Sequence, residues 1–468
     1  MPDIDLDRVR ALVGAANVLT DADAAPALVD WRTVYAGDAL AVVRPGTTDE
    51  VAAVMSWCAE HGIVVVPQGG NTGLSGGATP RGTRPCIALS LQRMRAIESV
   101  DAAGWTMTVQ AGVTIEAMQE AAAAADRLFA PDWGARGSAT IGGAIATDAG
   151  GNNVVRYGNM RDQVLGLEVV LADGRVWDGL RSLRKDSTGY DLAHLFVGSE
   201  GTLGVVTRAV VKLHPAPQYQ QSAMAALTDL DRLMDVFALA RSTAPDALTA
   251  FELLPETGVA KVCDTFDLAH PFATRADFYV LVRFAGTRPV TDLLATFLDD
   301  ASAAGLATDA AVAATAEQEQ RLWFLRDELP PMGLYPHQAE GLKLDAAVPI
   351  ERMVAFHDAV RAIADELAPD ALAYGFGHVG DGNLHMTILP LTDDDVPGFR
   401  AAKPELTRRI DEIIVGLGGT MSAEHGVGQE LRSRVAAQKP PVEWELMRTI
   451  KAALDPDDRL NPGVLLPE

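Results

Sequence analysis

The chain has 468 residues, 48% of them hydrophobic and 22% charged, and its formal net charge is −24. This length exceeds one ordinary hydrophobic core, so we expect two or three domains. Such an acidic surface repels nucleic acid and anionic lipid, and an anionic ligand would need a locally basic pocket. The three cysteines are far apart and form no CxxC pair, which excludes a thiolate zinc site and a disulfide framework from the prediction.

The N-terminus and the hydropathy of the chain predict a soluble, cytoplasmic protein. Residues 1–5 lack the basic and apolar segments of a secretory signal. No run of about eighteen apolar residues occurs, so no transmembrane segment is expected.

Residues 1–215 are predicted to form a first domain of mixed helices and strands. A helix with polar capping residues begins near Thr48 and should stop at Gly62. The apolar run Ile63–Pro67 follows as a short buried strand. Further strands are expected at Glu168–Ala172 and Gly204–Leu213.

Three glycine-rich segments punctuate this first domain. The first, Gly69–Gly77, has five glycines in nine residues directly after a predicted strand, and the others are Gly137–Gly151 and Val197–Thr207. Without Cβ atoms, backbone N–H groups can approach phosphate oxygens closely, although a tight loop without a ligand is the alternative. The spacing matches neither G-x-G-x-x-G nor a P-loop. Three such segments indicate a long, polyphosphate-bearing ligand.

Residues 216–410 are predicted to form a second domain, with residues 411–468 as a helical segment that packs back on the first. Pro215 and Pro217 mark the change in texture. Helical runs then alternate with strands and predict an α+β fold whose antiparallel sheet is covered on one face. These runs are Asp229–Ser242, Ala247–Leu253, Phe278–Phe284, Pro289–Ala304 and Ala371–His378.

Two histidines flank an Asp-Gly pair in the second domain. This pair favours a two-residue hairpin loop, which would place His378 opposite His385 with Cβ atoms roughly 4.5–5.5 Å apart. Two imidazoles at that spacing suit one divalent metal. Glu424 is a natural third ligand that leaves one position open for substrate. A lone histidine such as His194 is interpreted as structural.

These motifs together resemble those of the FAD-linked oxidases of the vanillyl-alcohol-oxidase type. Within that family they are most like the D-2-hydroxyacid dehydrogenases, the group of D-2-hydroxyglutarate and D-lactate dehydrogenases. The resemblance spans residues 40 to 465 and rests on Pro67–Gly77, Thr140–Gly151, Gly198–Thr207, Gly377–His385, Ala423–Gly428 and Leu454–Gly463. It implies a PCMH-type FAD-binding domain of two α+β subdomains plus an α+β substrate (cap) domain with an antiparallel sheet.

The resemblance also implies where FAD binds. The first loop has no His, Cys or Tyr, so FAD is expected to be held without a covalent bond. Asp148 stands where the family usually has Asn, and Val464 where it usually has Lys. The residues expected at the cofactor are Pro67, Gly69, Gly70, Asn71, Thr72, Gly73, Ser138, Thr140, Ile141, Gly142, Gly143, Gly150, Val206 and Asn461.

The same resemblance implies the roles of the active-site residues. His378, His385 and Glu424 would bind a divalent metal, with zinc expected, and His425 would be the active-site base. A metal lowers the pKa of a bound hydroxyl, an adjacent imidazole accepts its proton, and flavin N5 takes the hydride. The substrate residues expected are Arg326 for the carboxylate, Lys343 for the other end, and Thr387, where some hydroxyglutarate enzymes carry Asn.

The sequence thus predicts oxidation of a D-2-hydroxy acid to the 2-oxo acid. D-2-hydroxyglutarate is favoured because Lys343 is available for a second carboxylate, and D-lactate or another monoacid is the alternative. A zinc hydrolase without redox chemistry and a non-catalytic flavin-binding subunit are the alternatives from other classes. The family resemblance implies an electron-transfer flavoprotein or a quinone as electron acceptor. The oligomeric state stays open, with a homodimer among the options.

Overall fold

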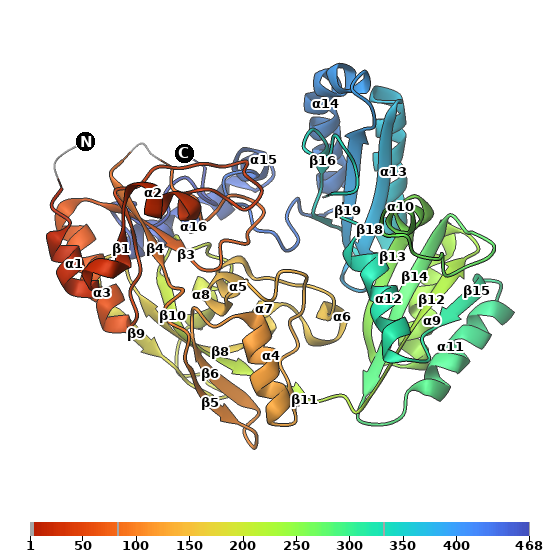
Figure 1. Cartoon of the computed structure of the whole chain (residues 1–468), viewed down its shortest axis with the longest axis horizontal. Helices are drawn as coiled ribbons and strands as arrows, with labels where there is room; N and C mark the ends of the chain where they lie inside the picture. The colour runs from red at the N-terminus through yellow and green to blue at the C-terminus, as the bar shows by residue number, and fades with distance from the viewer. Residues whose placement is uncertain (1–3, 82–83, 331–332, 468) are drawn as a thin grey trace. The chain divides into compact units, whose positions relative to one another are not determined.

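The computed structural model describes residues 4–81, 84–330 and 333–467, and they form two compact units (Figure 1). One unit contains the residues up to Gly150, residues 158–215 and the residues from Glu424 onward. The other contains residues 151–157 and 216–423. The chain therefore passes between the units at four places: 150/151, 157/158, 215/216 and 423/424. We call them the N-terminal unit and the sheet unit.

The first sheet of the N-terminal unit carries the first glycine-rich loop. Its order is β1-β2-β4-β3, with β2, β4 and β3 parallel. The bounds are β1 Val18–Leu19, β2 Ala41–Val43, β3 Val64–Gln68 and β4 Cys86–Ser90. Helix α3 (Thr48–His61) begins after Thr47, whose side chain accepts the Glu50 N–H, and ends at Gly62 with φ 65°. The predicted helix and the strand after it are confirmed.

The second sheet of the N-terminal unit is antiparallel, in the order β5-β6-β10-β8-β9. Its bounds are β5 Ile97–Asp101, β6 Thr106–Gln110, β8 Val164–Val170, β9 Val176–Gly179 and β10 Val205–Lys212. An apolar cluster joins this sheet to α4 (Ile115–Ala124) and α5 (Ile141–Thr147). The two α+β subdomains predicted for the FAD-binding half are therefore present.

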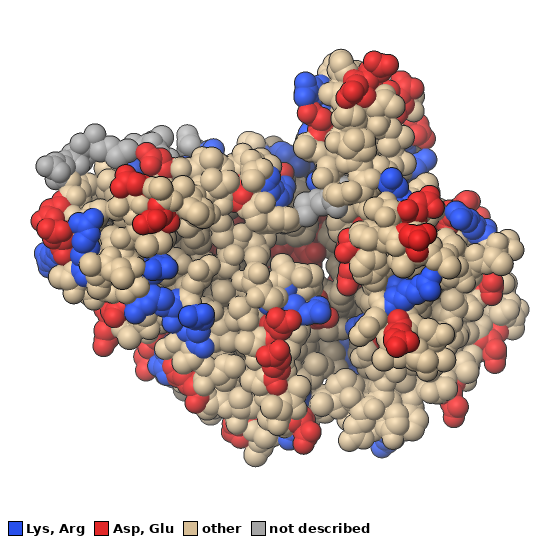
Figure 2. Space-filling model, viewed as in Figure 1, with Lys and Arg blue, Asp and Glu red and all other residues tan. Residues whose placement is uncertain are grey.

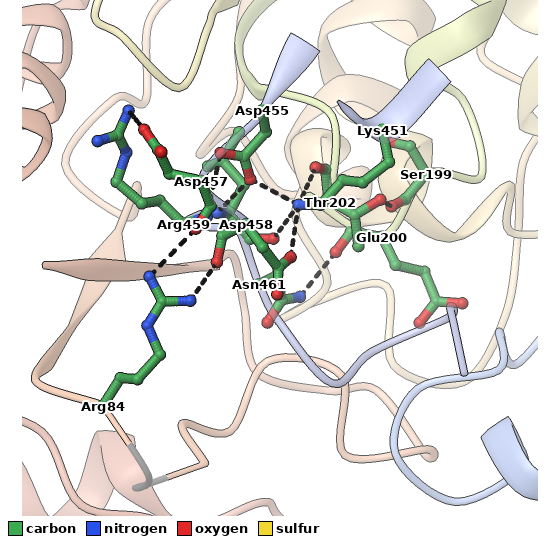
Figure 3. Close-up of polar contacts among 11 residues, drawn as sticks. Arg84, Ser199, Glu200, Thr202, Lys451, Asp455, Asp457, Asp458, Arg459 and Asn461 are labelled. Atoms are coloured by element: carbon green, nitrogen blue, oxygen red, sulfur yellow. Dashed lines mark hydrogen bonds and ion pairs between the residues drawn. The ribbon is translucent and has the colours of Figure 1, made fainter. Parts of the chain in front are cut away.

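The remaining elements of this unit are short except for the 14-residue helix α16, and the segment that follows this helix returns to the first sheet. Leu460 forms a parallel bridge with Val65 of β3. The buried Lys451 ammonium donates to the Asp455 carboxylate and to the backbone oxygens of Thr202 and Leu460 (Figure 3). The elements are α1 Asp7–Val13, α2 Asp21–Ala24, β7 Arg127–Leu128, α7 Met160–Gln163, α8 Ala193–Phe196, β11 His214–Pro215, α15 Arg432–Ala436 and α16 Pro441–Leu454.

The sheet unit is built on one eight-stranded antiparallel sheet, in the order β15-β12-β14-β13-β18-β19-β16, with β17 also paired to β19. Its strands are β12 Tyr219–Leu227, β13 Leu248–Pro255, β14 Phe278–Gly286, β15 Ala307–Val312, β16 Leu342–Lys343, β17 Ala346–Ala347, β18 Ala371–His378 and β19 Asn383–Pro390. Its helices are α6 Val154–Tyr157, α9 Leu233–Thr243, α10 Glu256–Phe266, α11 Thr291–Ala303, α12 Ala316–Asp327, α13 Met353–Leu367 and α14 Asp395–Gly416. The predicted runs are confirmed within a few residues.

Two expectations for this unit are wrong. Both faces of the sheet are covered: α9, α11, α13 and α14 bury one face, and α10 and α12 bury the other. The boundary expected at residue 410 falls inside α14, because Leu406, Ile410 and Ile414 form one continuous buried stripe along it.

In addition, α6 packs against the β18–β19 turn, where a Cβ on Gly380 would lie 2.4 Å from a methyl of Val155.

The charged surface and the polarity of the helices agree with the acidic, moderately hydrophobic composition. Acidic side chains are spread over the face shown in Figure 2, with Lys and Arg between them. Across the described parts of the chain, no helix has the length and apolar character needed to cross a membrane.

Candidate active site

The turn between the two predicted ligand histidines differs from the expected hairpin. His385 lies opposite Phe376, not His378, and the strands are joined by the four residues 379–382 with a 3-10 turn over Val379–Asp381. Gly382 has φ 85°, but Asp381 does not have the positive φ that a two-residue loop requires. The predicted register is therefore wrong by two residues. Because this shift is even, both side chains stay on one face, and their ring centroids are 5.4 Å apart.

The site residues of the sheet unit occupy one grid on the face covered by α10 and α12. Strand pairing aligns Tyr374 and Lys343 with Thr387 of β19, one on each side. Two residues further along each of these strands, Phe376 and Asp345 lie on either side of His385. They are on the same face as the first set, because side chains alternate between the faces of a sheet. His378 lies opposite Glu252 of β13. Strand register alone thus gathers the predicted histidines and Lys343.

A buried ion pair orients His378. Its Nδ1 lies 2.8 Å from Glu252 Oε1, and the other carboxylate oxygen accepts from Arg326 Nε at 2.7 Å. Arg326, which α12 brings over the sheet, also donates from Nη2 to His378 Nε2 at 3.3 Å. All three residues are buried. Burial raises the pKa of Glu252, but His378 and Arg326 outweigh it and bring that pKa to about 2.

A second carboxylate, that of Asp345, lies beside His385. The Nδ1 atom of His385 is 3.7 Å from Asp345 Oδ1, and this oxygen accepts from the Asn383 amide at 3.0 Å. The other Asp345 oxygen accepts the Ala423 N–H at 3.1 Å. Metal-binding histidines commonly give one ring nitrogen to a carboxylate and the other to the metal. The carboxylate beside Nδ1 of His385 therefore leaves its Nε2 for a divalent metal, whereas His378 Nε2 accepts from Arg326 in this structure and must exchange that donor for the metal.

The far end of the grid carries Lys343 and Thr387. Lys343 is exposed and Thr387 is buried. Thr387 lies opposite Tyr374 of β18, whose hydroxyl donates to the Leu329 carbonyl at 3.2 Å. Arg326 and Lys343 are thus two cations at separate positions on this face.

In the N-terminal unit, the first and second glycine-rich segments approach each other closely. A Cβ on Gly70 would lie 1.9 Å from the Ser138 carbonyl oxygen, and one on Gly69 would lie 2.3 Å from Thr140 Oγ1. That hydroxyl is buried and has no hydrogen-bond partner among the described residues. Buried polar atoms are normally hydrogen-bonded. A buried hydroxyl beside two glycine-rich segments therefore fits a site for a bound polar cofactor.

Other residues expected at FAD have partners of their own. The side chains of Ile141 and Val206 lie in the apolar cluster of the second sheet, so they can offer a cofactor only their backbone. The Asn461 amide donates to the backbone oxygens of Gly77 at 2.9 Å and Glu200 at 2.7 Å (Figure 3). Asn71 donates to the Val29 carbonyl at 2.9 Å.

The two departures from the family pattern have structural explanations. Asp148 ends α5 with φ 54° and accepts from Asn159 and from the Arg161 N–H, with the Arg161 side chain at 3.3 Å. Val464 is buried. His194, expected to be structural, pairs with Asp191 at 2.5 Å.

Glu424 and His425 open the C-terminal segment of the N-terminal unit. They follow Ala423, whose N–H is bound by Asp345. The Glu424 carboxylate lies 3.5 Å from His425 Nε2, and both side chains are partly exposed. The Ser75 hydroxyl donates to the backbone oxygen of Gly426 at 2.9 Å.

Sequence reasoning missed Glu252 and Asp345. Glu252 is a charged residue inside the apolar strand Leu248–Pro255, which is an available signal of a buried ion pair. Asp345 gives no such signal, because only strand pairing brings it to His385. The remaining cofactor candidates lie in or next to the same segments: Pro67 in β3, Thr72 and Gly73 in the first glycine-rich segment, Gly142 and Gly143 in α5, and Gly150 after it.

The fold and these loops define an FAD-dependent oxidoreductase, and comparison with known proteins gives its family. Residues 39–179 match a model described as an FAD binding domain, and residues 216–465 match the FAD linked oxidases, C-terminal domain. The chain therefore belongs to the FAD-linked oxidase family.

Curated relatives match nearly the whole chain. The D-2-hydroxyglutarate dehydrogenase of Xanthomonas citri pv. viticola is 37% identical over 93% of this chain and 91% of its own length. The mitochondrial D-2-hydroxyglutarate dehydrogenase of Bos taurus is 36% identical over 99% of this chain and 83% of its own. A solved structure of p-cresol methylhydroxylase superimposes with a TM-score of 0.75 at 18% identity, covering 98% of this chain and 96% of its own. That likeness confirms the fold class.

Proposed function

We propose that the protein is an FAD-dependent D-2-hydroxyacid dehydrogenase that acts on D-2-hydroxyglutarate. The observation that carries the proposal is the single sheet face that holds two carboxylate-oriented histidines and two cations, Arg326 and Lys343. The relatives named D-2-hydroxyglutarate dehydrogenase support the choice of substrate.

In this proposal, His378, His385 and Glu424 hold a divalent metal, expected to be zinc. Glu252 and Asp345 fix the orientation of the two imidazoles. Ala423, bound to Asp345, is joined to Glu424 by a peptide bond, so chain continuity supports Glu424 as the third ligand. When bound, the metal polarises the 2-hydroxyl and lowers its pKa.

His425 accepts the 2-hydroxyl proton. An imidazole titrates near neutral pH, which suits a general base at physiological pH. FAD, held by the glycine-rich loops of the N-terminal unit, supplies the two-electron acceptor when bound.

The two cations bind the two ends of the substrate. Arg326 binds the carboxylate next to the reacting carbon, for which its planar guanidinium is suited. Thr387 lies two residues beyond His385, so Lys343 opposite it is about 7 Å further along the strands. A five-carbon dicarboxylate is long enough to place its 2-hydroxyl near His385 and its distal carboxylate at the Lys343 ammonium. D-lactate has no group to reach Lys343.

The family resemblance supports one further part of the proposal: an electron-transfer flavoprotein or a quinone as acceptor. Reoxidation rates of the reduced flavin with each acceptor test this part. Faster reoxidation by oxygen than by either acceptor would contradict it.

Anaerobic mixing with a panel of D-2-hydroxy acids tests the reaction directly. We expect the yellow flavin to bleach fastest with D-2-hydroxyglutarate. Faster bleaching with D-lactate would identify the monoacid as the preferred substrate instead. No bleaching with any acid would reject it, and a colourless but active metalloprotein would favour a zinc hydrolase.

Two variants and a chelator separate the roles. His425→Ala should retain FAD and lose most of its rate of flavin reduction, and an unchanged rate would remove His425 as the base. Lys343→Ala should lower kcat/KM for D-2-hydroxyglutarate at least about tenfold more than for D-lactate, because a charged hydrogen bond is lost. Lys185→Ala, an exposed lysine of the other unit, is the control. Chelation should stop turnover while FAD stays bound.

A further inference from the structure

Glu200 lies in the third glycine-rich segment, and its carboxylate contacts a different part of the chain. One carboxylate oxygen accepts the Val427 N–H at 2.7 Å, and the other accepts the Gly428 N–H at 2.8 Å. Gly426 and Gly428 both have positive φ, 77° and 53°. Such backbone turns successive N–H groups toward one side and forms a concave anion site. Here the anion is a side chain of the same unit.

The backbone of Glu200 is itself fixed on both sides. Its N–H donates to the Ala146 carbonyl at 2.7 Å, and its carbonyl accepts from the Asn461 amide at 2.7 Å (Figure 3). Its φ is 51°, a conformation that costs about 1–2 kcal/mol for a residue other than glycine. Such strain persists where surrounding contacts over-determine a functional residue.

Glycines surround this carboxylate and pack closely. A Cβ on Gly426 would lie 3.2 Å from the Glu200 carboxyl group, and one on Gly77 would lie 3.2 Å from Oε2. A Cβ on Gly428 would lie 2.1 Å from the Ser75 carbonyl oxygen. That same oxygen accepts the Gln429 N–H at 2.8 Å, and the Ser75 hydroxyl donates to the Gly426 carbonyl.

We infer that Glu200, supported by Ser75, is a positioning residue that fixes the backbone of residues 425–428 and thereby the aim of the His425 imidazole. The inference rests on the proposed function only in the role that it gives to His425. It also gives Ser75 in the first glycine-rich segment and Glu200 in the third a new role. They hold the segment that carries His425, while Gly69, Gly70 and Thr140 remain the candidates for the cofactor.

The energetics of the carboxylate support this role. Burial raises the pKa of Glu200 to about 7, and the two backbone N–H groups offset only part of that increase. A buried carboxylate kept at such a cost is expected where its hydrogen bonds hold a precise geometry.

Hydrogen exchange measured by mass spectrometry on the FAD-loaded protein tests the contact without relying on activity. In Glu200→Gln, an amide group faces one of the two N–H donors, so exchange in a peptide covering 424–431 should rise at least about tenfold. Glu200→Ala should behave alike, and if it fails to fold, the isosteric Gln variant carries the test. Unchanged exchange in a folded Glu200 variant would overturn the inference.

Glu168→Gln is the matched control. Glu168 is also a buried carboxylate of the N-terminal unit, and it accepts from Thr48 at 2.6 Å and from Thr207 at 2.8 Å, far along the chain from His425. This variant should lower the melting temperature without raising exchange in 424–431.

Kinetics then separate positioning from general stability. Glu200→Gln should lower kcat about 10- to 100-fold with FAD content and KM nearly unchanged, since small misplacements of a catalytic group have such effects. In a His425→Ala background the same change should cost less than about twofold, because coupled residues are non-additive. An equal loss in both backgrounds would overturn the inference. A wild-type flavin that no D-2-hydroxy acid bleaches would reject the proposed function, while the exchange experiment would still decide the contact.

Discussion

Each unit contains a buried glutamate that contacts a predicted active-site residue or the backbone segment that carries one, and the partners of the two glutamates differ. Glu252 of the sheet unit is paired with Arg326 and His378, and its pKa is lowered to about 2. Glu200 of the N-terminal unit accepts two backbone N–H groups, and its pKa is raised to about 7. Ionic partners therefore more than offset the cost of burial, whereas two amide dipoles do not. The sheet unit fixes its residues by charge, and the N-terminal unit fixes them by backbone shape.

The largest effect is expected from neutralising Glu252. Glu252→Gln leaves Arg326 buried without its counter-charge, so the free energy of unfolding should fall by about 3–5 kcal/mol. Metal affinity should fall about 10- to 100-fold, because His378 loses the partner of its Nδ1. Urea unfolding and metal titration measure these effects. A stability equal to that of the wild type would show that charge does not hold this site.

The two glutamates should also respond to pH in opposite windows. The stability that Glu200 contributes is fully present below its ordinary pKa near 4.5 and is lost as the pH rises through about 7. That of Glu252 is present above about 4.5 and is lost as the pH falls toward 2. Between pH 5 and 8, therefore, Glu200 should lower the free energy of unfolding by about 3 kcal/mol. Because the Gln side chain does not titrate, the melting temperature of the wild type should fall relative to that of Glu200→Gln as the pH rises from 5 to 8, and parallel curves would contradict this.

An intermediate effect is expected at Asp345. Asp345→Asn places an amide donor toward the Asn383 amide or the Ala423 N–H, which should cost about 2 kcal/mol. Metal affinity should fall about tenfold through His385. Isothermal titration with zinc measures this change. An unaffected affinity would remove Asp345 from the support of the metal site.

The smallest effect is expected from adding one methyl group to the N-terminal unit. Gly426→Ala must adopt φ 77° and place its Cβ near the Glu200 carboxyl group, which should cost about 1–2 kcal/mol. Gly416→Ala, in α14 with open space around it, is the control. Differential scanning calorimetry distinguishes them. Equal melting temperatures would show that the backbone at 426 adapts.

Much of this arrangement was predictable from local sequence signals. Thr48 and Gly62 bound a helix, and the glycine-rich segments and the Gly377–His385 motif predicted the family, as the comparisons confirm. The hairpin register failed because Asp381 and Gly382 belong to a longer turn, in which only the glycine needs positive φ.

The partners of the site residues were not predictable in the same way. Glu252 reaches His378 across 126 residues, and Glu200 reaches Val427 across 227. No local pattern encodes such pairings, since strand order and loop packing create them. The packing of α10 and α12 on the second face of the sheet was missed for the same reason. The sequence of a helix between two strands does not indicate which face of the sheet the helix covers.

The four passages of the chain between the units limit how this enzyme can be recombined. Residues 151–157 lie between two segments of the N-terminal unit, yet Val155 packs against Gly380 and Arg156 donates to the Ala285 carbonyl at 2.6 Å. A chimera that imports only residues 216–423 from a relative would therefore place a foreign turn against a native Val155. The sheet unit is thus encoded by two separate stretches of the gene, and an exchange of this unit must carry both.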